Sequence, residues 1–276
     1  MALKIQAIVT GELAASVGEI LINGGPPDGP RPYGYDEAIP LPDGSTMTGI
    51  RQPVPVFLIT GGEKVILVDT GMGSAGELIE VFRNHGMEIY CRKEAEWEIE
   101  KALAGAGLTP EDIDIVFHTH LHYDHIGNNE AFRRARFLVP PEEMDWALNP
   151  PHHWGAGPYF PEFGEHVRSV QDRISLLGRE GEVIPGVEYF RLGAHSPGFT
   201  AIAVETALGR IVLAGDIMFD AISVEHDWPS GFYYRLDEFA PAYERIHAEA
   251  DIIIPGHDWK VWDEFPDLVI GPDSSR

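Results

Sequence analysis

The sequence predicts an α+β fold in which two β-sheets pack together with helices on their outer sides, in one domain over residues 1–276. The first observation is that apolar runs of strand length fall into two groups along the chain. The second is that amphipathic segments of helix length follow each group, an order typical of layered folds. The third is size, because 276 residues with 44% hydrophobic content are enough for one large buried core.

The first half of the chain is rich in expected strands. They cover residues 4–11, 19–23, 54–60, 64–71 and 112–120. Between the last two, residues 94–108 place Ile99 and Leu103 four positions apart, which predicts an amphipathic helix that Gly105 and Gly107 end.

The second half repeats this pattern with more helix. We expect strands at 135–140, 187–192, 200–206, 210–217 and 251–256, and helices at 142–148, 165–179 and 236–250. Three stretches rich in proline and glycine, at 24–44, 149–161 and 228–234, are expected to be loops. Their aromatic residues favour a role as walls of a pocket.

Charge excludes several classes of partner. The chain has 20 basic and 44 acidic residues and a net charge of −24, so its surface repels nucleic acid and anionic membranes and favours a small neutral or weakly charged substrate.

The opening "MALKIQAIVTGEL" has an apolar run too short for a signal peptide, which predicts a cytoplasmic protein. The single cysteine, Cys91, excludes an internal disulfide and a cysteine-based zinc site. A monomer and a homodimer both stay open.

The segment "HTHLHYDH" at 118–125 holds four of the twelve histidines. His120 and His122 are two positions apart and can face one point, whereas Asp124 and His125 can face a second point nearby. Imidazole and carboxylate without thiolate are typical of catalytic sites for zinc or for iron, manganese or cobalt. The cluster therefore predicts two adjacent divalent metal ions.

Two metals need further ligands, and three polar residues that end apolar runs supply candidates. His195, Asp216 and His257 each follow an expected strand, where side chains of neighbouring strands can converge. Together with the cluster they form a seven-residue constellation, which is a far stronger indication of metal than any single member.

This pattern resembles the metallo-β-lactamase superfamily, with Asp69 in "VDTG" matching its first motif. The resemblance implies the αββα sandwich, with the site at one edge of the sheets. It implies the following ligands: His120, His122 and His195 for the first metal, Asp124, His125 and His257 for the second, and Asp216 between the two. Asp69 would orient ligands through hydrogen bonds rather than bind metal.

Within the superfamily, the segments around 109–129, 215–220 and 256–262 look most like the N-acyl homoserine lactonases, which have quorum-quenching activity. That resemblance implies hydrolysis of a lactone or related ester by a hydroxide shared between two metals, most simply zinc. Asp216 would hold the metals together, and Asp124 would pass a proton to the leaving oxygen.

Residues around this centre receive separate predictions. His118, where the family has an apolar residue, is expected to support the site without binding metal. Phe219 replaces the tyrosine that these lactonases place three residues after the bridging aspartate, so a typical hydroxyl is missing. The remaining residues predicted for the substrate pocket are His152, His153, Trp154, Tyr233 and Tyr234.

Other activities stay as alternatives. The substrate could be another cyclic ester, a lactam or a thioester, and a non-catalytic metal-dependent binding protein is the alternative of a different class. An exported β-lactamase would need a signal peptide, and a nuclease of this family conflicts with the net charge. A glutathione thioesterase would be expected to have a basic C-terminal site, but residues 262–276 are acidic. An iron oxygenase acting on persulfides usually lacks part of the second metal set, which this chain has in full.

Overall fold

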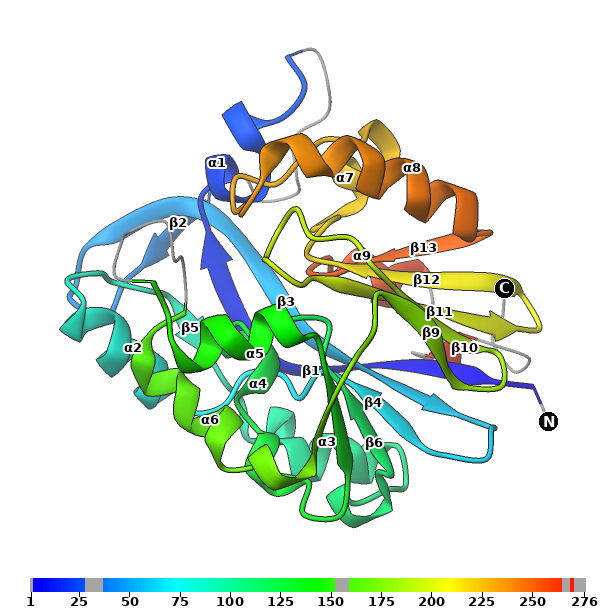
Figure 1. Cartoon of the computed structure of the whole chain (residues 1–276). Helices are drawn as coiled ribbons and strands as arrows, with labels where there is room; N and C mark the ends of the chain where they lie inside the picture. Colours follow the sequence, from blue (N-terminus) through cyan, green and yellow to red (C-terminus); the bar gives the residue numbers. More distant parts are fainter. Residues whose placement is uncertain (1, 28–36, 152–158, 265–268, 271–276) are drawn as a thin grey trace.

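Two β-sheets lie face to face, and helices cover the outer side of each (Figure 1). The structure is a computed structural model that describes residues 2–27, 37–151, 159–264 and 269–270. The layer order is αββα, as predicted. No helix in these described ranges combines the length and the apolarity needed to cross a membrane.

The larger sheet contains nine of the described strands. They are β1 (Lys4–Ala15), β2 (Glu37–Pro40), β3 (Thr46–Thr60), β4 (Ile66–Val68), β5 (Cys91–Arg92), β6 (Ile115–Phe117), β7 (Arg136–Val139), β8 (Ile174–Leu176) and β14 (Val269–Ile270). Their order is β14-β1-β3-β4-β6-β7-β8, with β2 beside β3 and β5 beside β1. Strands β1 and β3 pair antiparallel over most of their length, whereas β4, β6, β7 and β8 are parallel.

The smaller sheet has five strands among the described residues. They are β9 (Glu180–Ile184), β10 (Val187–Arg191), β11 (Thr200–Thr206), β12 (Gly209–Gly215) and β13 (Ile252–Pro255). Their order is β13-β12-β11-β10-β9, and only β12 and β13 pair in parallel. Parallel pairing sends the chain ends after β12 and β13 to the same edge, where the candidate site lies.

Nine α-helices are described. They are α1 (Val17–Ile20), α2 (Ala75–Asn84), α3 (Ile99–Gly105), α4 (Tyr123–Ile126), α5 (Pro141–Leu148), α6 (Gly164–Arg168), α7 (Ala221–His226), α8 (Phe239–Glu249) and α9 (Lys260–Glu264). Short 3₁₀ helices cover Ile22–Gly24, Ala95–Trp97, Pro110–Asp112, Asn129–Ala131, Pro161–Phe163, Gln171–Arg173 and Leu236–Glu238.

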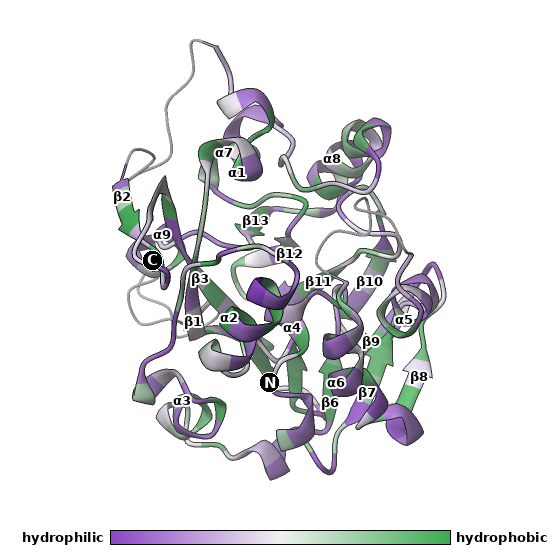
Figure 2. Cartoon of the chain, turned by 90° about the vertical axis from the view of Figure 1, so that its left-hand side faces the viewer, coloured by the Kyte–Doolittle hydropathy of each residue, from purple (hydrophilic) through white to green (hydrophobic). Residues whose placement is uncertain are grey.

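The alternation of side chains along the strands explains the layers. In β11, Ile202 and Val204 point toward the larger sheet and join a core that contains Phe57 and Ile59 of β3. The intervening Ala201 and Ala203 join a second core against α8. Helices α2, α3, α5 and α6 pack on the outer face of the larger sheet through a third core. Figure 2 shows the apolar strands enclosed between helices with hydrophilic outer surfaces.

Four predicted elements differ from the structure. The loop expected over 24–44 contains the strand β2, Glu37–Pro40, which pairs with β3. Residues 19–23 form α1 and a 3₁₀ turn instead of a strand, because Glu19 accepts a hydrogen bond from the Ser16 backbone N–H and closes a helical turn. The predicted helix 165–179 ends early, and Ile174–Leu176 pairs with β7 as strand β8. The helix predicted over 94–108 is a 3₁₀ turn followed by α3, since Glu98 between them is extended.

Candidate metal centre

Loops at one edge of the two sheets bring the predicted ligand residues together. The loop after β6 and the helix α4 that follows it carry the cluster 118–125, whereas His195 follows β10, Asp216 follows β12 and His257 follows β13. The centre therefore draws on the larger sheet and the smaller sheet. All seven side chains of the predicted constellation are buried.

Three imidazoles form the first group. His120 Nε2 lies 2.9 Å from His122 Nδ1, and His195 Nε2 lies 3.1 Å from the same nitrogen. Ring nitrogens with such convergence can hold one metal ion. These are the residues that the sequence assigned to a first metal.

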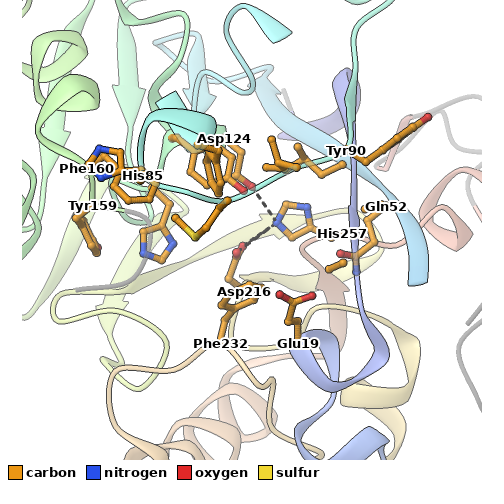
Figure 3. A pocket seen from close by; sticks show the side chains of 18 of the residues that line it. Glu19, Gln52, His85, Tyr90, Asp124, Tyr159, Phe160, Asp216, Phe232 and His257 are labelled. Atoms are coloured by element: carbon orange, nitrogen blue, oxygen red, sulfur yellow. Dashed lines mark hydrogen bonds and ion pairs between the residues drawn. The ribbon is translucent and has the colours of Figure 1, made fainter. Parts of the chain in front are cut away.

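The second group consists of Asp124, His125 and His257. Asp124 Oδ2 lies 3.6 Å from His125 Nε2 and 3.8 Å from His257 Nε2. Figure 3 shows Asp124 and Asp216 both directed toward the same ring nitrogen of His257, Nε2.

Asp216 lies between the two groups and forms a third group with His120 and His125. Its Oδ2 is 3.5 Å from His195 Nε2, and its Oδ1 is 3.4 Å from His125 Nε2 and 3.2 Å from His257 Nε2. Within the described residues, His125 Nε2 and Asp216 Oδ1 are buried without a hydrogen-bond partner. Buried polar atoms normally have a hydrogen-bond partner, so the two unpaired atoms are free to bind a metal ion. Together with the three convergent groups, they fit a site for divalent metal ions.

The second ring nitrogen of the histidines is also held in place. His195 Nδ1 lies 3.1 Å from the Phe232 carbonyl oxygen, and His257 Nδ1 lies 2.8 Å from the Pro53 carbonyl oxygen. His125 Nδ1 lies 2.8 Å from Asp69 Oδ2. Such contacts fix the ring orientation and the tautomer, leaving the inward nitrogen as a ligand.

Asp69 connects several parts of the loop that carries the cluster. It accepts hydrogen bonds from the backbone N–H and the hydroxyl of Thr119, at 2.9 and 2.7 Å, besides its contact with His125. Burial opposes ionisation, but His125 and His118 hold the pKa of Asp69 below its ordinary value. Its φ of 60° is unusual for a residue other than glycine, and these contacts stabilise it.

His118 lies outside the metal-binding groups found among the described residues. Its Nδ1 is 3.3 Å from Asp69 Oδ1, and its Nε2 is 3.0 Å from Asn129 Oδ1. Both ring nitrogens thus face oxygen atoms of supporting side chains.

The surroundings of His120 and His122 favour the neutral form of both imidazoles, which is the form that can bind a metal ion. Burial, with the nearby His125, lowers the pKa of His120 well below its usual range, and burial with the nearby His195 does the same for His122. Both imidazoles are therefore neutral at pH 7, the form that binds metal. Burial opposes the charge of Asp216, but the neighbouring histidines His257 and His125 hold its pKa well below the ordinary value.

A cavity of about 830 Å³ opens onto this centre. Phe219 lines it and stacks on His257 with a ring separation of 5.1 Å and an interplanar angle of 25°. Phe232 also lines the cavity, whereas among the described residues Tyr233 and Tyr234 do not and are 46% and 43% exposed. His152, His153 and Trp154 lie outside the described residues.

Glu143 and Tyr159 are site residues that the sequence analysis missed. Glu143, fully buried in α5, accepts hydrogen bonds from Leu121 N at 3.0 Å, Ser196 Oγ at 2.7 Å and Gly198 N at 2.6 Å, and another from the Tyr159 hydroxyl. It therefore joins the loops that carry the three histidines of the first group. Its spacing of four from Ala147 placed it on the buried face of the helix, which was the available signal.

Comparison with known proteins identifies the family of this chain. The family model described as metallo-β-lactamase superfamily matches residues 49–257. The chain belongs to the metallo-β-lactamase superfamily. Among curated members, the N-acyl homoserine lactonase of Bacillus thuringiensis is 28% identical over 216 residues, which cover 76% of this chain and 82% of the relative.

Other known proteins are similar over different shares of the chain. Human metallo-beta-lactamase domain-containing protein 1 is 32% identical over 163 residues, covering 56% of this chain and 51% of the relative. A crystal structure of a B. thuringiensis AiiA variant with N-decanoyl-L-homoserine at its active site has a TM-score of 0.72 at 22% identity and covers 96% of both chains. AidC, a dizinc quorum-quenching lactonase, has a TM-score of 0.67 at 17% identity and covers 93% of this chain and 88% of its own. These structures confirm the fold predicted for this superfamily member.

Proposed function

We propose that this superfamily member is a metal-dependent hydrolase that opens the ring of a neutral lactone or a related ester. The observation that carries the proposal is the set of three convergent His/Asp groups at the end of a largely apolar cavity. The curated relatives named N-acyl homoserine lactonase support the lactone assignment.

The proposed cofactor is a pair of divalent metal ions, with zinc as the first candidate and iron, manganese or cobalt as alternatives. The proposed ligands are His120, His122 and His195 for one ion and Asp124, His125 and His257 for the other, with Asp216 contacting both. When bound, the ions would supply Lewis acidity and a water molecule of lowered pKa.

Three acidic residues have distinct proposed roles. Asp216, ionised and between the two groups, maintains the spacing of the ligands. Asp124, whose carboxylate lines the cavity, would take up the proton that the attacking water loses and pass it to the oxygen released when the ester opens. Asp69 and His118 position ligands from behind, since both lie in the buried hydrogen-bond network around His125 and Thr119.

The cavity supports a substrate with an apolar portion. Phe219 presents a ring without a hydroxyl beside His257, so the substrate face at this point is expected to be apolar. We therefore propose that another cyclic or aryl ester is a better substrate than typical acyl homoserine lactones. The acidic composition is consistent with a neutral substrate. A cytoplasmic location, expected from the sequence, is part of the same proposal.

Purified protein supplied with zinc, manganese, iron or cobalt tests the proposal. Lactones, aryl esters, lactams and thioesters are assayed on the same preparation, with metal content measured in parallel. We expect turnover of lactones or esters with close to two metal ions per chain. Metal-loaded protein that turns over none of these compounds would support the binding-protein alternative instead.

A further inference from the structure

A carboxylate lies at the end of the cavity that opens onto the metal centre. Glu19, in α1, lines the cavity, and Figure 3 shows its side chain directed toward the part of the cavity that Asp216 and His257 line. Its Oε2 accepts a hydrogen bond from Ser16 N at 2.6 Å. Glu19 belongs to none of the metal-binding groups found among the described residues, so its charge is not used to hold an ion.

The position of Glu19 is fixed relative to that of the candidate ligands. Its backbone carbonyl oxygen accepts hydrogen bonds from Gly231 N and Phe232 N, at 2.9 and 3.2 Å. The Phe232 carbonyl oxygen in turn lies 3.1 Å from His195 Nδ1. The loop that orients one candidate ligand therefore also anchors α1, which keeps the Glu19 carboxylate at this end of the cavity.

Among the described residues, no lysine or arginine lines the cavity, whereas Glu19, Glu88, Asp124 and Asp216 do. Arg83 lies outside the lining and pairs with Glu88 at 3.2 Å, but no lysine or arginine in the described ranges forms an ion pair with Glu19. Asp124 and Asp216 belong to the metal-binding groups. The negative charge of Glu19 is therefore uncompensated within the part of the chain that the structure describes.

The proposed reaction creates another negative charge in the same space. Water adds a hydroxyl group to the ester carbonyl carbon and the acyl carbon–oxygen bond breaks, while the released oxygen takes up the remaining proton of the water. At neutral pH the new carboxylic acid loses its proton to solvent and becomes a carboxylate. Because carboxylates are good ligands for divalent cations, the product of each turnover would compete with the next substrate for the centre.

We propose that Glu19 is a specificity-determining residue that repels carboxylates from the reacting end of the cavity. Like charges repel each other strongly in a partly desolvated site, whereas a neutral lactone or ester carries no net charge to be repelled. Glu19 thereby weakens binding of the carboxylate product and excludes esters that carry a carboxylate beside the reacting group. The inference rests on the proposed hydrolysis of a neutral lactone or ester and assigns this selectivity to a residue outside the metal centre.

Binding of an acid and of its amide to zinc-loaded full-length protein tests the proposal. The probes are γ-hydroxyoctanoate, the ring-opened form of γ-octalactone, and γ-hydroxyoctanamide, which has the same length and no charge. We expect Glu19→Gln to lower the Kd of the acid by about fivefold or more at low ionic strength, and this difference to shrink in high salt. The Kd of the amide should change by less than about twofold, because an uncharged group is not repelled. Isothermal titration calorimetry measures both values, and product inhibition of γ-octalactone hydrolysis should follow the same order.

The variants separate charge from shape. Glutamine keeps an oxygen that can accept the Ser16 N–H, so the helical turn at α1 is retained. Glu19→Asp and Glu19→Asn repeat the charged and neutral comparison with a shorter side chain if glutamine impairs folding. Glu225→Gln is the matched control, because Glu225 in α7 is 60% exposed, does not line the cavity and loses the same charge. We expect this control to bind acid and amide as wild type does.

An acid-to-amide ratio of Kd values that is the same in wild type, Glu19→Gln and Glu19→Asn would overturn the proposal. An equal shift in Glu225→Gln would also overturn it, because net charge and not the position of Glu19 would then govern binding. If wild-type protein hydrolyses no lactone or ester, the proposed function fails, and the binding comparison still decides whether Glu19 repels a carboxylate.

Discussion

Replacing Glu143 with alanine removes the acceptor shared by two loops of the metal centre. Two of its four donors, the backbone N–H groups of Leu121 and Gly198, cannot rotate to find other partners. Each buried donor left unpaired costs about 1–3 kcal/mol. Burial raises the pKa of Glu143 against the effect of its donors, so removing the carboxylate also removes a desolvation cost. We expect a net loss of about 2–4 kcal/mol in the free energy of unfolding.

The same change should weaken metal binding. Glu143 supports the loops that carry His120, His122 and His195, and the loss of such support typically costs about 10–100-fold in metal affinity. Zinc affinity is measured by competition with a chelating dye, and the free energy of unfolding by urea denaturation of the metal-free protein. Glu143→Gln keeps one oxygen acceptor, so we expect partial recovery of both quantities.

Glu142→Ala is the control on the same helix. Its exposed carboxylate pairs with Arg191, and such surface pairs contribute at most about 1 kcal/mol. We expect its metal affinity to match that of wild type. If both alanine variants behave alike in stability and zinc affinity, the positioning role of Glu143 is wrong.

The other predictions concern the centre, the cavity and the free thiol. Asp216→Ala should lose metal, measured by elemental analysis, together with turnover, and full activity with one metal per chain would contradict the dinuclear mechanism. His118→Gln should keep metal and most turnover whereas His120→Gln abolishes turnover, so equal metal loss in both would refute the assignment of His118 as a support. Phe219→Tyr should raise turnover of acyl homoserine lactones relative to the best cyclic or aryl ester, measured as a ratio of kcat/KM values. Burial raises the pKa of Cys91 to about 11, so the thiol is neutral at pH 8 and should react with a thiol reagent roughly 100-fold more slowly than in urea, whereas equal rates would contradict its burial.

The ligand constellation could be predicted because its information is local. The cluster and each of the three distant candidate ligands lie shortly after an apolar run, and the ends of such runs meet at one sheet edge. The structure indeed brings the side chains of His195, Asp216 and His257 to the cluster. The two-sheet core was also predictable, since the alternation in β11 assigns one face to each layer.

Features that depend on distant partners were not predictable in this way. The sequence of residues 174–176 is compatible with a helix, and pairing with β7 makes it a strand. The four donors of Glu143 come from three separate segments, so its role is invisible before the loops are placed.

The contact between His257 and Pro53 links two parts of the molecule that are distant in sequence. His257 follows the smaller sheet, whereas Pro53 belongs to β3 of the larger sheet. An ion bound by both His257 and the cluster after β6 can bind only when the two sheets are packed together, that is, docked. Ion binding and the docking of the sheets are therefore linked equilibria. By mass action, an ion that binds only the docked form stabilises it further with each increase in free ion concentration. If the centre holds metal as proposed, the resistance of this fold to unfolding is set partly by metal supply.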